Sequence, residues 1–316
     1  MKRLRRWEEA GAAAALLSLL ILFTALSPGF ATLRTAGNVL TFAAVLGVIA
    51  LGSTLLMAAG EFDLSVGSMA ALAGMLFAMG TARWSCDTYA MAGVALAVGT
   101  LLGLLNGAIT LSTGIPSFIT TLGTMLLWRG AVLGVSGGFP VSWLDERRGV
   151  LIWLGSTLGA GLSSGALWWL AAAGLLAWLL KATPFGNHVL ATGGNAAAAR
   201  GMGVNTRRVK LACFGASGLL ASLAGLILFS QLRDLSPTAG ESYELYGIAS
   251  AVIGGTPLAG GAGTIGGTVL GTLIIGVVQA GLVHSGIDSY WFRCFVGVLL
   301  VGSVIVNVRL KRVAQP

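Results

Sequence analysis

Long apolar runs without charge, separated by short polar segments, dominate the hydropathy pattern of this chain. A helix that crosses the hydrocarbon core of a bilayer needs about 20 consecutive apolar residues. Two of the runs are long enough to hold two such helices each. The pattern therefore predicts an all-α integral membrane protein with about ten transmembrane helices, in the runs Ala10–Ser27, Thr35–Gly60, Leu64–Ala82, Thr88–Trp128, Gly149–Leu180, Leu211–Leu232, Leu245–Ile287 and Phe295–Val308.

Proline and glycine mark the places where the two longest runs divide. Pro116 disfavours helix in the residue before it, so the first division falls at 114–116. The glycine-rich segment 254–267 divides the second run. The run 149–180 exceeds one span, which leaves room for a short surface helix before its transmembrane helix. A count of nine stays open, because the eighth helix and the polar break GEFDLSVGS at 60–68 are the weakest parts of the pattern.

The first run raises the question of a signal peptide, since it follows the charged segment MKRLRRWEEA. Its apolar part is too long for the usual h-region, and no A-x-A cleavage motif follows it before SPGF. We therefore expect a retained first helix and one transmembrane domain over residues 1–316. The first five helices would occupy about 10–135 and the last five about 150–308. Two halves of five helices predict opposite topologies, although we see no sequence repeat between them.

Composition supports a membrane location. The chain has 316 residues, of which 56% are hydrophobic and 9% charged, and its mean hydropathy is +0.88. Soluble domains are about one quarter charged, so this chain has too little polar surface to cover a globule in water. Its net charge of +8 does not indicate nucleic acid, because the cations lie in short segments between apolar runs. We therefore expect the apolar helices of this chain to be surrounded by lipid.

The distribution of Lys and Arg predicts the orientation. The N-terminal segment, the segment 181–210 and the C-terminal tail together hold 12 of the 19 Lys and Arg residues. Cytoplasmic segments are enriched in these residues. With ten helices, all three segments lie on one side. We therefore expect a multi-pass membrane protein whose two termini are cytoplasmic.

The segment Lys181–Lys210 is the longest polar interruption in the second half of the chain. Asn195 is a good N-cap, the alanines at 196–199 favour helix, and Gly201 and Gly203 can end it. A short helix with glycine edges presents a shallow surface that suits docking into a groove on another protein. The alternative is an ordinary loop at the lipid headgroups.

Catalytic and metal-binding motifs do not account for the polar residues. The chain has no G-x-S-x-G, no H-E-x-x-H and no paired cysteines, and its two histidines are far apart. The segment TPLAGGAGTIGG lacks the lysine that a phosphate-binding P-loop requires. We interpret its glycines as positions of close helix packing and expect no cofactor in this chain.

A few polar residues lie next to or inside the apolar runs. Carboxylates near the hydrocarbon are costly and usually face an interior path or a partner, which makes Glu61 and Asp63 notable. Asp63 is also placed to cap the third helix. Asn106 is expected to bond to a neighbouring helix, with contact to a substrate as the alternative. Glu244 is expected to stabilise the start of the eighth helix.

Five motifs resemble one known family. They are DLSVGS at 63–68, IPSFITTLGTM at 115–125, TPFGNHVLATGGNAAAARGMGV at 183–204, GLLASLAGLI at 218–227 and ELYGIASAVIGGTPLAGGAGTIGGTVLG at 244–271. In this order they are similar to the permease subunits of ribose-type bacterial ABC importers, which carry monosaccharides and related small polyols. Many members read GGIDLSVGS, whereas Gly60-Glu61-Phe62 stands here in place of Gly-Gly-Ile. Glu241-Ser242-Tyr243 also replaces a stretch in which members often have another glycine.

The resemblance implies a fold like that of the vitamin B12-type ABC permease and a dimer with a second permease, identical or homologous. It also implies two ATP-binding cassette subunits, which hold ATP and Mg, and a periplasmic sugar-binding protein. The loop between helices six and seven would dock on the ATPase. ATP hydrolysis is therefore expected in another chain, and this chain is expected to be a transport component rather than an enzyme.

Two groups of residues are candidates for function, and three other functions compete with a sugar importer. The residues for the translocation path are Glu61, Asp63, Ser65, Asn106, Thr120 and Glu244; those for the ATPase-coupling segment are Gly194, Asn195, Ala198, Arg200, Gly201 and Gly203. The rivals to a sugar importer are a permease for another solute such as an amino acid, an ion-driven secondary transporter, and a membrane enzyme. DLSVGS favours the sugar.

Overall fold

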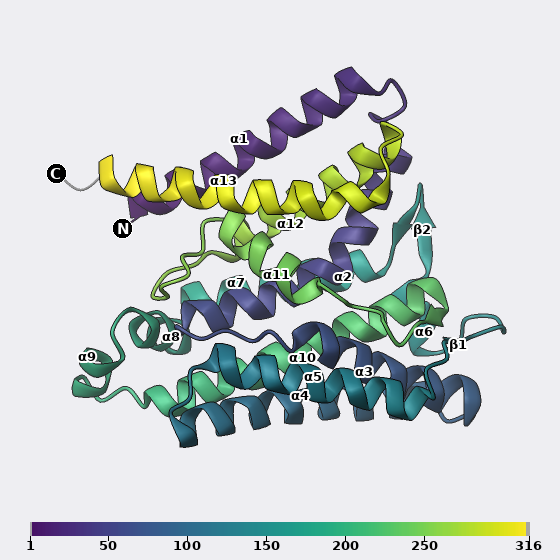
Figure 1. Cartoon of the computed structure of the whole chain (residues 1–316), viewed down its shortest axis with the longest axis horizontal. Helices are drawn as coiled ribbons and strands as arrows, with labels where there is room; N and C mark the ends of the chain where they lie inside the picture. Colours follow the sequence, from purple (N-terminus) through teal and green to yellow (C-terminus); the bar gives the residue numbers. More distant parts are fainter. Residues whose placement is uncertain (1, 314–316) are drawn as a thin grey trace.

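Helices make up most of the described chain in the computed structural model, which describes residues 2–313 (Figure 1). Met1 and residues 314–316, the ends of the predicted domain, lie outside the described residues. The helices are α1 (Lys2–Leu26), α2 (Leu33–Ala58), α3 (Val66–Ala78) with a π-helical turn (Met79–Arg83), α4 (Thr88–Thr113), α5 (Ser117–Ser136), α6 (Val150–Gly155), α7 (Gly165–Ala182), α8 (Pro184–Gly194), α9 (Ala196–Gly201), α10 (Thr206–Leu232), α11 (Tyr243–Ile253), α12 (Ile265–His284), a 3-10 turn (Ser289–Trp291) and α13 (Phe292–Val313).

Two strand pairs complete the described part of the chain. Strand β1 (Val141–Ser142) pairs antiparallel with β4 (Asp234–Leu235), and β2 (Thr157–Gly159) forms a hairpin with β3 (Leu162–Ser163). Each strand has two or three residues, so neither pair forms an independent layer. Their role is to tie connections together at one end of the helices.

Eight of the described helices are long and apolar enough to cross a membrane. Both predicted divisions are confirmed, because α4 ends at Thr113 and α5 begins at Ser117, and because α11 and α12 flank residues 254–264. The predicted short helix before the sixth span is confirmed as α6. The eighth span requires a correction. Helix α11 has 11 residues, which reach about 16 Å, and the hydrocarbon core measures about 30 Å.

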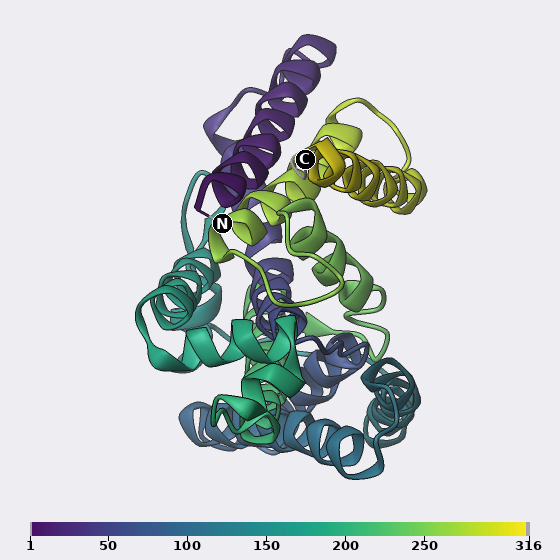
Figure 2. The ribbon, with the colours of Figure 1, turned by 90° about the vertical axis from the view of Figure 1, so that its left-hand side faces the viewer.

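Helices α10 and α2 form the centre of the bundle. Helix α10 packs against α4, α3 and α2, and α2 packs in turn against α12, α11 and α7. In Figure 1, α3, α4, α5 and α10 form a lower layer, and α1, α12 and α13 lie above α2. The view along the helices shows the same grouping, with α5 and α13 at the periphery (Figure 2).

Glycines permit the closest helix contacts, as the sequence predicted. A side chain at Gly218 of α10 would collide with the carbonyl oxygen of Gly99 on α4. One at Gly225 of α10 would collide with the carbonyl oxygen of Ala70 on α3. The 254–267 segment behaves in the same way, since Gly254 and Gly267 lie backbone to backbone. Small residues therefore bring these helices together without intervening side chains.

The two ends of the bundle differ. Figure 1 shows both strand pairs at one end. At the other end lie α8, α9, the start of α1 and the end of α13. The three basic segments that the sequence predicted on one side of the membrane therefore belong to one end of the molecule.

Candidate functional site

The polar break between α2 and α3, residues 60–65, is a hydrogen-bonded cluster inside the protein. Oδ1 of Asp63 accepts hydrogen bonds from the backbone N–H of Ser65 at 2.8 Å and from its hydroxyl at 2.6 Å. The amide Nδ2 of Asn106 on α4 donates to Oδ2 of Asp63 at 3.2 Å and to Oγ of Ser65 at 2.8 Å. Asp63, Ser65 and Asn106 are all buried. Asn106, which was predicted to bond to a neighbouring helix, bonds instead to the break in front of α3.

The prediction that Asp63 caps the third helix is wrong, because the N-cap residue of α3 is Ser65. Helix α3 begins at Val66, with Ser65 as its N-cap residue and without a hydrogen bond from the Ser65 side chain to the helix. Asp63 binds the N–H of Ser65 instead, in front of the helix. The reason is that Leu64 and Ser65 form a turn, so the break extends further into the predicted third helix than the hydropathy pattern indicated.

Helix α5 contributes two hydroxyls to the cluster, and neither residue was among the predicted site residues. Oγ of Ser117 accepts the N–H of Phe62 at 3.1 Å, and Oγ1 of Thr121 accepts the N–H of Leu64 at 3.0 Å. Their i, i+4 spacing at the start of an apolar helix was the signal that could have identified them. The predicted residue Thr120 is buried beside them, but its hydroxyl has no partner among the described residues.

Glu61 points away from this cluster toward the basic segment. Its Oε1 forms an ion pair with Nζ of Lys210, near the start of α10, at 2.5 Å. Both side chains are largely buried, with 12% of Glu61 and 19% of Lys210 exposed. The distribution of Lys and Arg predicts only that Lys210 lies on the cytoplasmic side; it does not predict the pairing with Glu61.

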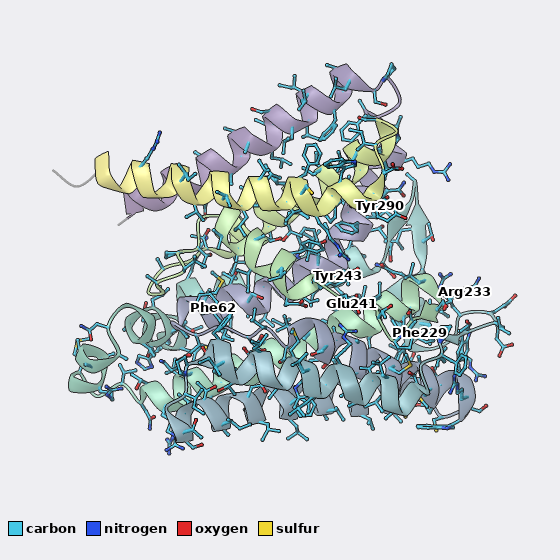
Figure 3. The ribbon with its side chains drawn as sticks, in the orientation of Figure 1. Phe62, Phe229, Arg233, Glu241, Tyr243 and Tyr290 are labelled. Atoms are coloured by element: carbon cyan, nitrogen blue, oxygen red, sulfur yellow. The ribbon has the colours of Figure 1, made fainter. Side chains whose placement is uncertain are left out.

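Glu244 lies apart from the break, in the first turn of α11 as predicted. Its carboxylate lies against Gly67 of α3, where a side chain would have no room. Nearby, one guanidinium nitrogen of Arg129 donates to the carbonyl oxygens of Pro237 at 2.9 Å and Ala239 at 2.8 Å. Glu241 and Tyr243, at the start of α11, lie in the middle of the molecule between its upper and lower layers (Figure 3).

The basic segment folds into α8, α9 and the start of α10. Oδ1 of Asn195 accepts the N–H of Ala198 at 3.0 Å, so the predicted cap is confirmed, and α9 ends at Gly201 as predicted. Gly203 has a φ of +86°, which favours glycine. The coupling candidates Gly194, Asn195, Ala198, Arg200, Gly201 and Gly203 are all exposed.

The groups of the break are hydrogen-bonding groups rather than a set of metal ligands. Within residues 2–313 no group of three His, Cys, Asp or Glu side chains is close enough to hold a metal ion. The cysteines at 86, 213 and 294 are free. The carboxylate, amide and hydroxyls of the break are hydrogen-bonding groups of the kind that recognise hydroxylated solutes.

Comparison with known proteins agrees with the motifs. The family model described as "Branched-chain amino acid transport system / permease component" matches residues 35–304. The ribose import permease protein RbsC of Escherichia coli K12 is 36% identical over 294 residues, which cover 93% of this chain and 91% of the relative. RbsC of Bacillus subtilis 168 is 36% identical over 95% of this chain and 92% of its own length.

A second kind of relative is similar over an even longer stretch. The autoinducer 2 import system permease protein LsrC of Photorhabdus laumondii is 32% identical over 98% of this chain and 92% of its own length. No solved structure matches the chain.

Proposed function

The chain belongs to the family of permease components of branched-chain amino acid transport systems, and we propose that it is the permease subunit of an ATP-driven importer for a monosaccharide or related small polyol. The observation that carries this proposal is the similarity to ribose import permeases over nearly the whole chain. The family description favours a second candidate substrate, an amino acid. The DLSVGS motif at 63–68 and the identity of the full-length relatives favour the sugar.

The path for the solute would use the break and its surroundings. Asp63, Ser65 and Asn106 form a buried cluster of hydrogen-bonded polar side chains between the break and α4. Thr120 adds a buried hydroxyl without a partner among the described residues, and Glu244 adds a carboxylate at the start of the short helix α11. Glu61 belongs to this proposal through its position at the break, although its side chain pairs with Lys210.

ATP hydrolysis would be coupled through α9. Ala198, Gly201 and Met202 are exposed, at the end of the molecule that also holds α8 (Figure 2). A shallow helical surface can enter a groove on an ATP-binding cassette subunit. ATP and Mg would be bound by that partner, and movement of α9 would alternate the access of the path to the two sides of the membrane.

The complete importer would contain further chains. We propose a vitamin B12-type permease fold and a dimer, formed with a second copy or a homologous permease, in the inner membrane. A periplasmic sugar-binding protein would dock at the end that carries the strand pairs. The termini and α9 would be cytoplasmic, which the concentration of Lys and Arg in those segments supports.

The experiment that tests this function is purification of the tagged full-length chain from mild detergent with identification of the proteins that accompany it. We expect an ATP-binding cassette protein and a periplasmic binding protein, and sugars that raise the melting temperature of that binding protein would name the substrate. The assembled complex should import the sugar into liposomes only with ATP. Transport by the chain alone without ATP would overturn the proposal in favour of an ion-driven carrier.

A further inference from the structure

Three consecutive side chains of the break contact three different parts of the bundle. Glu61 pairs with Lys210 on α10. Phe62 packs with the cluster of Met57, Ala251 and Val252, which belongs to α2 and α11, and Figure 3 shows it close to the end of α2. Asp63 accepts the amide of Asn106 on α4. A displacement of residues 61–63 would therefore disturb contacts with α10, α11 and α4 at the same time.

The break also contacts the coupling segment directly, through glycines. A Cβ at Gly60, whose φ is +81°, would lie 3.3 Å from Cα of Gly193 at the end of α8. At Gly260 it would lie 2.9 Å from Cα of Gly60 and from the carbonyl oxygen of Gly193. The N–H of Gly261 donates to the carbonyl oxygen of Ala58 at 3.1 Å. The ends of α2 and α8 and the 254–264 loop thus meet backbone to backbone.

Helix α9 is linked to the first turns of α10. The N–H of Val204 donates to the carbonyl oxygen of Ala199 at 3.0 Å, and Nη1 of Arg200 donates to Oγ1 of Thr206 at 3.4 Å. Oδ1 of Asn205 accepts the N–H of Arg208 at 3.0 Å and caps α10. These hydrogen bonds connect α9 to the start of α10, where Lys210 lies. Asn195 connects α9 to the end of α8, which contacts Gly60.

We propose that Glu61 and Lys210 are positioning residues that transmit displacement of the α8–α9 segment to the buried cluster of Asp63, Ser65 and Asn106; this inference rests on the proposed function. Separation of the pair would leave an uncompensated charge in a mostly buried place, which is costly, so the two side chains move together. The glycine contacts keep α8 and the break close together, and the ion pair joins Lys210 of α10 to Glu61 of the break. Motion of α9 would then shift the start of α3 relative to α4 and α5.

The pair depends on the side chain at position 61, in the motif Gly60-Glu61-Phe62. A glycine at position 61 has no side chain to reach Lys210. The link through Glu61 is therefore an addition to the packing of glycines, and Glu61→Gln removes its charge while the side chain keeps nearly the same size.

The test uses the complete importer in liposomes and measures sugar uptake per ATP hydrolysed. We expect Glu61→Gln and Lys210→Met each to lower this ratio at least about fivefold, the lower end of typical coupling between sites. The exchange of both charges, Glu61→Lys with Lys210→Glu, should restore most of it. Glu146→Gln, a matched change of an exposed acid outside both candidate sites, should leave the ratio unchanged.

A second readout separates coupling from folding. Amide hydrogen exchange of residues 61–66 should change between the ATP-bound and nucleotide-free complexes of the wild type. In Glu61→Gln this response should disappear while the response of residues 196–203 remains. Unchanged uptake per ATP in both single variants, or an exchange of charges that does not restore coupling in a folded complex, would overturn the inference alone. Absence of ATP-driven uptake by the wild type would overturn the proposed function and the inference with it.

Discussion

Asn106 of α4 donates its side-chain amide at 3.2 Å to Asp63, which lies in the break between α2 and α3. Asp63 is 4% exposed and Asn106 is fully buried. A buried carboxylate is costly unless it is hydrogen-bonded, and Asp63 receives its donors from Ser65 and Asn106. The break is consequently held to α4 by a contact that the protein cannot lose without penalty.

We therefore expect Asn106→Leu to destabilise the protein. The change removes a donor from a buried carboxylate, and a lost partner of a buried polar group costs about 1–3 kcal/mol, with larger values for charged groups. The melting temperature of the purified protein in detergent should fall. Asn38→Leu is the matched control, because Asn38 on α2 is exposed. Equal melting temperatures for the two variants would show that Asn106 does not hold the break.

A second prediction concerns the contact between α8 and α2. Gly193→Ala places a methyl group against the carbonyl oxygen of Ala58 and the N–H of Gly261, which belong to backbone and cannot turn away. Overpacking of this kind costs about 1–3 kcal/mol, so the melting temperature should fall and uptake should be impaired. Gly174→Ala on α7 has no atom within 4 Å of the added methyl. It should melt at the same temperature or slightly higher, as alanine favours helix.

The break illustrates what sequence reasoning can and cannot predict here. Hydropathy located the spans, and the Pro116 and Gly254 divisions were confirmed, because span length and helix breakers are local properties. The cap at Asn195 was also local and was confirmed. The pairing of Glu61 with Lys210 joins residues 149 positions apart, and no local sequence pattern around either residue indicates it.

The length of α11 was missed for a related reason. Residues 245–287 carry no charge before Asp288 and read as two spans. Helix α11 ends at Ile253 because the chain turns at Gly255, whose φ is +94°, and then packs its 254–264 loop against α8. Composition shows many glycines there, but only the tertiary contacts determine which of them end a helix.

A third prediction tests orientation with thiol chemistry. Cys86 is exposed between the π-helical turn and α4, at the end that carries the strand pairs. In cells whose protein carries Cys294→Ser, a membrane-impermeant maleimide should label Cys86 from the outside. With Cys86→Ser added, Met202→Cys, at a position that is 74% exposed, should react only in inverted vesicles. The reverse pattern would place the termini and α9 in the periplasm.

The last prediction concerns docking of α9. Gly201 is exposed, and no atom lies within 4 Å of a side chain added there. Gly201→Trp should therefore fold normally while its large ring blocks a shallow surface from a partner groove. We expect loss of the ATP-binding cassette subunit from the purified complex and loss of ATP-driven uptake, with the melting temperature of the permease alone unchanged. Gly93→Trp on α4, which is also exposed and equally free of neighbours, should retain both. If Gly201→Trp still co-purifies with the ATPase and imports sugar, α9 is not the docking element.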